Sequence, residues 1–214
     1  MTKPLIIIGG GGHAKVLLDV IKRCNFQVLG LVDPNYVSAS EHLGLSVLGD
    51  DQAIQNYSYN DIVLVNGLGS LPKDLGLRHR LFTHFQVLGY TFKTLIDPTA
   101  FLAADHQLGN GVQVLAGVII QAGTIIAENS IINSGAIVEH DCRIGKHVHI
   151  APGAVLSGAV EVGDYVHIGT GAVVIQGLRI GTGSIIGAGS VVTKDVADGQ
   201  IVYPARSCIQ AIET

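Results

Sequence analysis

One histidine of this 214-residue chain stands between two carboxylates, in the run Val138-Glu139-His140-Asp141-Cys142. An imidazole titrates near neutral pH, so it can remove a proton from an attacking amine or hydroxyl group. A neighbouring carboxylate, Asp141 or Glu139, can orient the ring and raise its basicity, as in a catalytic triad. The pattern therefore predicts a general base at His140, and the alternative is a surface histidine in a charged turn.

A second candidate site lies near the amino end, where Gly9, Gly10, Gly11, Gly12 and His13 follow a short apolar run. Glycines let a backbone approach an anion closely, and a helix that starts after them supplies unpaired N–H groups. The spacing Gly9-x-Gly11-x-x-Ala14 fits the dinucleotide-binding fingerprint loosely. The alternative is a tight strand-to-helix turn.

The amino-terminal elements alternate between strand and helix. We expect strands over residues 5–8, 27–32, 62–65 and 90–96, and helices over 14–23 and 77–88. The first helix should bury Val16, Leu17, Val20 and Ile21 on one face. Asp33 ends the second strand, where it can cap the strand or bind a uridine or ribose, and Asn66-Gly67 ends the third. The order predicts an α/β domain over residues 1–96 with a small parallel sheet, half of a Rossmann-like fold.

The rest of the chain has a period of six. Every sixth residue from Ile96 to Val192 is Ile, Leu or Val, without a gap. A period of six fits neither an ordinary amphipathic helix nor an isolated half-buried strand. It is typical of a β-helix built from hexapeptide repeats, whose short strands bury their apolar face by stacking. We therefore expect a β-helix domain over residues 97–214, with a closing carboxyl-terminal segment.

The hexads have internal detail that places single residues. The residue four positions after each aliphatic one, from 112 to 190, has a small side chain except at Leu178. The residue directly after the aliphatic one is Gly at 109, 145, 163, 169, 181 and 187. We interpret these glycines as corners with unusual backbone angles. Three hexads make one coil, so residues 108–192 make five coils with a rise of about 4.8 Å each. Cys142 should then face the core, which argues against a covalent acyl-enzyme intermediate.

The same arithmetic relates the histidines. His149 and His167 are one coil length apart in the sequence and should stack in adjacent coils. His140 and His149 are half a coil apart and should lie on different sides of the β-helix. Both can reach one ligand only if they come from different subunits, which predicts a homotrimer with sites between subunits. A histidine ladder on a solvated face is the other interpretation of His167.

Composition excludes several classes of function. Apolar residues make up 48% of the chain and charged residues 14%, with a net charge of −4. No apolar run is long enough to span a bilayer, and no charge pattern favours nucleic acid. The start lacks the features of a secretory signal, and Cys24, Cys142 and Cys208 are widely spaced and odd in number. We therefore expect a cytoplasmic protein.

Taken together, the glycine-rich start, Asp33, Asn66-Gly67 and the Glu-His-Asp triplet resemble nucleotide-sugar acetyltransferases of the sialic-acid O-acetyltransferase-like family. Most similar are the enzymes that N-acetylate UDP-4-amino sugars of the bacillosamine pathway or GDP-perosamine. Val192-Thr193-Lys194-Asp195-Val196 and Pro204-Ala205-Arg206 resemble the closing segment of this family, although Val202-Tyr203 replace its usual Gly. The resemblance implies a left-handed parallel β-helix, acetyl-CoA as co-substrate and no metal.

The resemblance also implies roles for single residues. His140 is the base and Asp141 its partner, with direct transfer of the acetyl group to the amine of a nucleotide-linked sugar. The implied contacts to acetyl-CoA are His149, Thr170 and Ala188, of which His149 would donate a hydrogen bond to the thioester oxygen. The implied contacts to the sugar nucleotide are Gly11, Gly12, His13, Asp33 and Gly67. The sequence leaves open which sugar and which nucleotide are used.

Three other functions fit parts of this pattern. An O-acetyltransferase acting on sialic acid or a similar hydroxyl would use the same base. A metal hydratase like γ-carbonic anhydrase would need three imidazoles around zinc, and the histidines at 140, 147, 149 and 167 lack the spacing we expect of it. An NAD-binding module fused to a structural solenoid would bind NAD but not acetyl-CoA.

Overall fold

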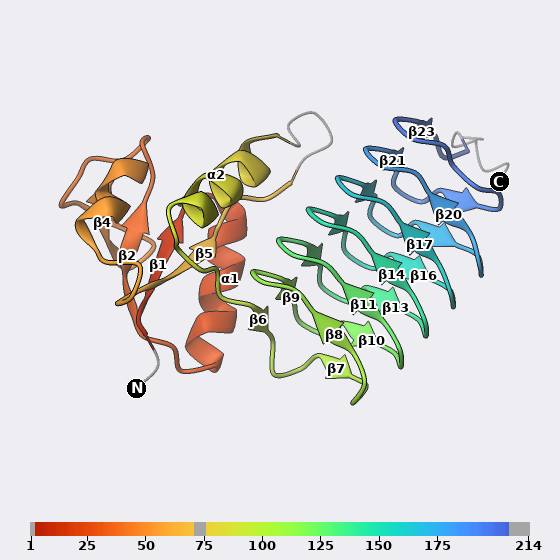
Figure 1. Cartoon of the computed structure of the whole chain (residues 1–214), viewed down its shortest axis with the longest axis horizontal. Coiled ribbons are helices and arrows are strands. Elements are labelled where there is room, and N and C mark those ends of the chain that lie inside the picture. Colours follow the sequence, from red (N-terminus) through yellow and green to blue (C-terminus); the bar gives the residue numbers. More distant parts are fainter. Residues whose placement is uncertain (1–2, 71–75, 206–214) are drawn as a thin grey trace, which may run out of the picture.

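The first strand, β1 (Leu5–Ile8), lies inside a five-stranded sheet of order β3-β4-β2-β1-β5. In this computed structural model, which describes residues 3–70 and 76–205, the sheet belongs to a small α/β domain at one end of a long solenoid (Figure 1). The other elements of the domain are α1 (Gly12–Arg23), β2 (Val28–Val32), β3 (Glu41–His42), β4 (Leu45–Gly49), the 3₁₀ helix η1 (Asp51–Asn56), β5 (Val63–Asn66) and α2 (Gly76–Val87). Arg206 and Cys208 lie outside the described residues.

The two helices cover opposite faces of the sheet. The core on one side joins α1 to the odd-numbered side chains of β1, and the core on the other joins Phe82 and Phe85 of α2 to the even-numbered ones. A strand buried on both faces explains why residues 5–8 are all aliphatic. Among the described residues, no helix is long and apolar enough to cross a membrane.

The domain differs from the sequence prediction in three details. The helix α1 begins at Gly12 and buries Ala14 and Leu18 with Leu17, Val20 and Ile21, while Val16 is 43% exposed and lies off the buried face. The hairpin of β3 and β4 was not predicted. Residues 90–96 are not a strand of this sheet: Phe92 makes one isolated bridge to Leu64, and β6 (Leu95–Ile96) pairs with the solenoid. The prediction of a strand was wrong there because this segment leaves the sheet of the α/β domain and enters the solenoid.

The solenoid is a three-sided prism, and its three parallel sheets are named here by their outward faces. The aliphatic face consists of β7 (Phe101–Leu102), β10 (Ile119–Ile120), β13 (Ile137–Val138), β16 (Val155–Leu156), β19 (Val173–Val174) and β22 (Val191–Val192). The charged face consists of β8 (Gln107–Leu108), β11 (Ile125–Ile126), β14 (Arg143–Ile144), β17 (Glu161–Val162) and β20 (Arg179–Ile180). The docked face consists of β6, β9 (Gln113–Val114), β12 (Ile131–Ile132), β15 (His149–Ile150), β18 (His167–Ile168), β21 (Ile185–Ile186) and β23 (Ile201–Val202).

The register confirms the predicted coil of three hexads, since Ile119 pairs with Ile137 and Ile137 with Val155. From β7 to β23 the second residue of each strand points into the prism, and together with the small side chains four positions later these residues form one continuous core. This is the left-handed parallel β-helix of hexapeptide repeats, as expected. Figure 1 shows the coils stacked from β7 to β23 with the α/β domain beside the first of them.

The glycines that follow the inward aliphatic residues have a different role from the predicted one. A Cβ at Gly163 would lie 2.7 Å from the backbone nitrogen of Thr182 in the next coil, and one at Gly169 would lie 2.5 Å from that of Ala188. Neither residue has a positive φ. The positive φ angles occur two residues later, at glycines such as Gly171 and at Asn129, Asp141, His147, Ala159 and Tyr165. The recurrent glycines therefore permit close approach of successive coils.

The α/β domain is joined to the docked face by polar contacts. The His13 ring donates to the Gln113 side chain at 2.7 Å, and Arg78 donates to the backbone oxygen of Asn129 at 3.4 Å. An ion pair links Arg23 of α1 to the buried Asp97 at the start of the solenoid. These contacts place the glycine-rich turn and the end of β5 against the solenoid.

Candidate active site

His140 lies in the turn after β13, at the edge between the aliphatic and the charged face, which we call the histidine edge. Its Nδ1 is 2.9 Å from Oδ2 of Asp141, and both side chains are more than half exposed. Nδ1–H therefore donates to the carboxylate and leaves the lone pair of Nε2 free to accept a proton. Asp141 has a φ of 60°, a conformation that Asp tolerates better than most residues. The turn itself thus sets the position of the carboxylate beside the ring.

Two glycines in the adjacent coils make room for this pair. Gly158 follows His140 by one coil length, and a Cβ there would lie 2.5 Å from Nε2 of the ring. Gly123 precedes Asp141 by one coil length, and a Cβ there would lie 2.5 Å from Oδ1 of the carboxylate. Sequence reasoning missed both residues, although adding and subtracting one coil length from the pair would have found them.

Two other candidates in the run, Glu139 and Cys142, make no hydrogen bond to the imidazole within the described part of the chain. Within the described part of the chain, the carboxylate of Glu139 makes no hydrogen bond, so Asp141 is the residue that orients His140. Cys142 is fully buried in the solenoid core, as predicted, and its thiol donates to the Ser157 oxygen at 3.3 Å. Burial raises the pKa of this thiol to about 11, which makes it a poor nucleophile.

We expect the Cys142→Ala enzyme to keep kcat/KM within about threefold of the original while losing roughly 1 kcal/mol of stability. The reason is that the side chain fills the core and does not face a ligand. Steady-state kinetics and urea unfolding measure the two effects, with Cys24→Ala as the control for loss of a thiol. A folded Cys142→Ala enzyme with turnover reduced a hundredfold would show that the thiol takes part in the reaction.

His149 and His167 stack as predicted, with paired positions on β15 and β18 and ring centroids 4.9 Å apart. They are only 9% and 8% exposed, so the solvated-ladder interpretation is wrong. Nδ1–H of His149 donates to the Ser70 oxygen at 2.9 Å, and its Nε2 accepts from the Asn133 amide at 3.1 Å. Burial lowers the pKa of His149, so the ring is neutral and has one proton. That proton is already donated, and the expected hydrogen bond from His149 to a thioester oxygen does not fit this arrangement.

Thr170 and Ala188 lie one above the other at the edge between the docked and the aliphatic face, which we call the glycine edge. Both are exposed, and the Gly189 N–H donates to the Thr170 oxygen at 2.9 Å. From the second turn of this edge onward, the third position of each turn is Gly with a positive φ, at 117, 135, 153, 171 and 189, and the first turn has Thr99 there. A Cβ built on any of the last four would have no atom within 4 Å, and one on Gly117 would only touch Gly135 at 4.0 Å. The edge is therefore a smooth strip along which an extended ligand can lie.

The residues predicted to contact a sugar nucleotide gather around the start of α1. Gly11 and Gly12 are exposed, and a Cβ at either would meet open space, so packing does not require glycine there. Asp33 accepts from the N–H of Gly10 at 2.8 Å and from that of Asn35 at 2.9 Å, which is the capping role. Gly67 is buried, and a Cβ there would lie 2.8 Å from the Ile8 oxygen, so it serves close packing at the end of β5.

A buried polar network behind this turn was not predicted. Arg78 is 4% exposed and donates to the backbone oxygens of Asn66, Leu68 and Asn129. Burial lowers its pKa to about 9. The side-chain oxygen of Gln113 accepts the hydrogen bond from His13, and its amide nitrogen donates to the Asn66 oxygen at 2.7 Å. The only signal in the sequence is that Asn66 and Gln113 are polar at positions where aliphatic residues are expected.

Three histidines of the site region are neutral because they are buried: the pKa of His13, His147 and His167 is lowered to about 4. In the unfolded chain each titrates near 6.5, so between pH 6.5 and 4 the unfolded state binds protons that the folded state does not. Stability is therefore complete above about pH 6.5 and falls as the pH drops toward 4. At His147 burial is the main cause of the lowered pKa, and the neighbouring His79 adds to it. Nδ1 of His147 also accepts from the Asn129 amide at 2.9 Å, which requires that this nitrogen carry no proton.

We expect the free energy of unfolding to fall between pH 7.5 and 5, and the His147→Gln protein to show a smaller fall. Urea unfolding at the two pH values measures this, with exposed His84→Gln as the matched control on α2. An equal decline in all three proteins would contradict the assignment to His147.

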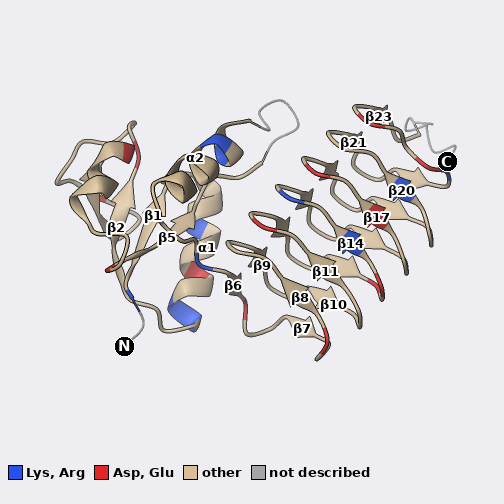
Figure 2. Cartoon of the chain, in the orientation of Figure 1, with Lys and Arg blue, Asp and Glu red and all other residues tan. Residues whose placement is uncertain are grey.

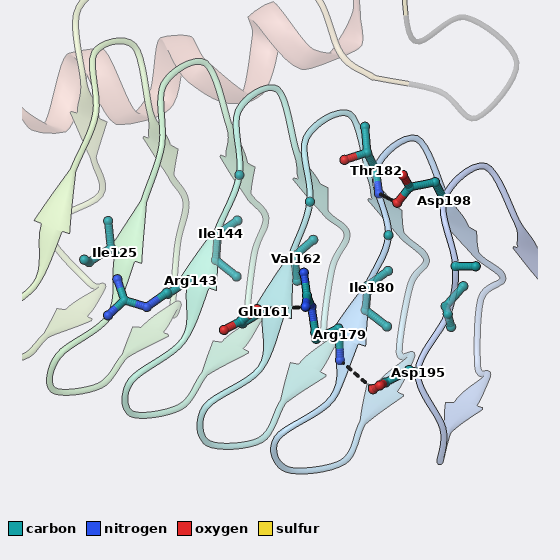
Figure 3. A pocket seen from close by; sticks show the side chains of 15 residues that line it. Ile125, Arg143, Ile144, Glu161, Val162, Arg179, Ile180, Thr182, Asp195 and Asp198 are labelled. Atoms are coloured by element: carbon teal, nitrogen blue, oxygen red, sulfur yellow. Dashed lines mark hydrogen bonds and ion pairs between the residues drawn. The ribbon is translucent and has the colours of Figure 1, made fainter.

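A groove of about 980 Å³ lies along the charged face, away from the candidate residues. Figure 3 shows Arg143, Glu161 and Arg179 in line along its floor, and Glu161 pairs with Arg179 at 3.3 Å. Figure 2 shows the same alternation of charge on β14, β17 and β20. The face is polar and exposed, and none of the predicted site residues lines the groove.

Within the single chain, the described residues include no cluster of three His, Cys, Asp or Glu side chains that could hold a metal ion. A hexapeptide β-helix with an exposed His–Asp pair at one edge and a smooth strip at another is the architecture of an acyltransferase. The fold and the site together thus define the protein as an acyltransferase.

Comparison with known proteins extends this to a family. The model described as the PglD N-terminal domain matches residues 4–82, and the bacterial transferase hexapeptide model (six repeats) matches residues 123–158 and 159–194. PerB from Caulobacter crescentus, solved with CoA and GDP-perosamine, is 38% identical, with 94% of each chain covered and a TM-score of 0.86. The acetyltransferase domain of PglB from Neisseria gonorrhoeae is 30% identical, with 94% of this chain and 96% of that one covered and a TM-score of 0.86. Curated protein sequences give no significant match.

WeeI from Acinetobacter baumannii, 20% identical with a TM-score of 0.68 over 94% of this chain and 96% of that one, shares the fold. The chain belongs to the family of acetyl-CoA-dependent nucleotide-sugar N-acetyltransferases that combine a PglD-type N-terminal domain with hexapeptide repeats.

Proposed function

We propose that this protein acetylates the free amino group of a UDP- or GDP-linked amino sugar, of the 4-amino-4,6-dideoxy type, at sites shared between subunits of a trimer. The observation that carries the proposal is the His140–Asp141 pair, exposed at the edge of a hexapeptide β-helix. The relatives support the chemistry, because PerB was solved with CoA and GDP-perosamine and PglB with acetyl-CoA. We further propose a cytoplasmic location and a domain boundary near residue 96.

In the proposed mechanism the sugar amine attacks the thioester carbon of acetyl-CoA directly. The lone pair of Nε2 of His140 takes the proton that the amine nitrogen loses as the new C–N bond forms. Asp141 holds the ring in the required tautomer and stabilises the imidazolium. When the C–S bond breaks, the imidazolium returns this proton to the departing thiolate, so the products are the amide and CoA.

The trimer is supported by the outward side chains of the solenoid. On the aliphatic face they are Phe101, Ile119, Ile137, Val155, Val173 and Val191, all apolar and all at least partly exposed. A continuous apolar strip on a solvent-facing sheet indicates an interaction surface. The face is bordered by the histidine edge on one side and the glycine edge on the other. If three such faces surround a threefold axis, the histidine edge of one subunit faces the glycine edge of the next, along which Thr170 and Ala188 lie.

In this proposal the sugar nucleotide binds at the start of α1. Its first N–H groups point away from the helix, Gly11 and Gly12 leave them uncovered, and a helix amino terminus favours phosphate. The ring of Tyr36 stacks on His42 at 3.8 Å beside Gly10 and borders this turn. Asp33 fixes the turn by its hydrogen bond to Gly10.

The test is release of free thiol from acetyl-CoA with a panel of UDP- and GDP-linked amino sugars, read with a thiol reagent, and mass spectrometry of the product. We expect turnover with one amino sugar and none with the matched sugar that has a hydroxyl in place of the amine. Turnover with the hydroxyl compound or with sialic acid would establish the O-acetyltransferase instead. No thiol release with any acceptor would overturn the proposal.

A further inference from the structure

Among the described residues, only two enclosed side-chain N or O atoms lack a hydrogen-bond partner, and one is Nδ1 of His167 on the docked face. Enclosed polar groups are nearly always paired, and leaving one unpaired is destabilising. The second such atom, Oγ of Ser190, lies in the solenoid interior. His167 by contrast stands three residues before Thr170, in the coil above His149.

The missing partner determines where the ring carries its proton. Burial and the neighbouring His149 lower the pKa of His167 to about 4, so the ring is neutral. An enclosed N–H without an acceptor is rarer and more costly than an enclosed lone pair without a donor. The proton therefore resides on Nε2, which makes no hydrogen bond within the described part of the chain.

The imidazoles of His149 and His167, which meet edge to face, are thus opposite tautomers. His149 has its proton on Nδ1, where the Ser70 oxygen accepts it, and its Nε2 is taken by Asn133. The amide of Asn133 is fixed in this orientation because its oxygen accepts from the Ser134 N–H at 2.8 Å. Of the two rings, only His167 has an N–H that is not already donated within the described part of the chain.

We propose that Nε2–H of His167 donates to the carbonyl oxygen of the bound acetyl thioester and stabilises the negative charge that this oxygen acquires during transfer. This inference rests on the proposed function and adds a catalytic residue to it. As the amine nitrogen bonds to the carbonyl carbon, the carbonyl π electrons move to the oxygen. They return when the C–S bond breaks, and the His167 proton stays on Nε2 throughout.

A matched pair of variants tests the role. The amide nitrogen of Gln can take the position of Nε2, whereas that of Asn lies near Nδ1 and falls short. We expect His167→Asn to lower kcat by about 10²–10³-fold with KM for acetyl-CoA nearly unchanged, and His167→Gln to recover at least tenfold of this loss. Equal losses in both variants, or a change confined to KM, would overturn the proposal.

A second measurement does not depend on turnover. The infrared band of the ¹³C-labelled thioester carbonyl, recorded for acetyl-CoA bound to the enzyme, should lie at lower frequency in wild type and His167→Gln than in His167→Asn. An identical band in all three would overturn the proposal while leaving acetyl transfer intact. If wild type binds acetyl-CoA but transfers nothing to any amino sugar, the proposed function fails and the infrared result still decides the hydrogen bond.

Discussion

Replacement of His140 by Ala is expected to lower kcat by about 10²–10⁴-fold with little change in KM for either substrate. The amine cannot lose its proton to water as readily as to an imidazole held beside it, and the turn after β13 holds no second imidazole to replace the ring. Exogenous imidazole should restore part of the lost turnover, because the exposed pair leaves space for it. Turnover within threefold of wild type would reject His140 as the base.

Two further variants test the geometry around the same ring. Asp141→Asn keeps a residue that tolerates the φ of 60° but removes the charge, and should reduce kcat by roughly ten- to a hundredfold. Gly158→Ala adds a methyl group 2.5 Å from Nε2 and should displace the imidazole. Its loss of turnover should approach that of His140→Ala. Circular dichroism serves as the control for folding, and full activity of Gly158→Ala would place the ring elsewhere during catalysis.

The period of six predicted the solenoid almost completely because each hexad has one conformation and the same two inward positions, one large and one small. The position of Cys142, the stacking of His149 on His167 and the offset of His140 all follow from that register. The α/β domain was less predictable. Val16 is apolar on a helix but exposed, and residues 90–96 contain Tyr90, Phe92, Leu95 and Ile96 without forming a strand of the sheet. In both places the outcome depends on packing between segments that no local pattern encodes.

The site was predictable where chemistry is local and not where it depends on hydrogen bonds between domains. Adjacent residues in one turn gave the His140–Asp141 pair. The tautomer of His149, in contrast, is set by Ser70, which is 79 positions away in the sequence and belongs to the other domain. The period places the ring of His149 on a face, but it carries no information about the contact that holds its proton.

A charge on the aliphatic face is expected to abolish both assembly and activity. Ile137→Glu puts a carboxylate in the middle of the proposed interface, where it would be buried without a partner. Ile125→Glu is the matched control, since Ile125 occupies the same outward position on the charged face and pairs in register with Arg143. Sedimentation should show a trimer for the control and a monomer for Ile137→Glu, with turnover reduced at least a hundredfold. An active Ile137→Glu monomer would rule out sites shared between subunits.

Mixed trimers test the shared site without disturbing the interface. His140→Ala damages only the histidine edge, and Ala188→Trp blocks only the glycine edge, so each variant alone should be inactive. Suppose that every site combines the histidine edge of one subunit with the glycine edge of its neighbour. In a random one-to-one mixture half of the subunits have an intact histidine edge and the other half an intact glycine edge, so about a quarter of the sites combine two intact edges. Refolding the two variants together should therefore recover about a quarter of wild-type turnover. If both edges served a site within one subunit, no pairing could combine two intact edges, and the mixture would stay inactive.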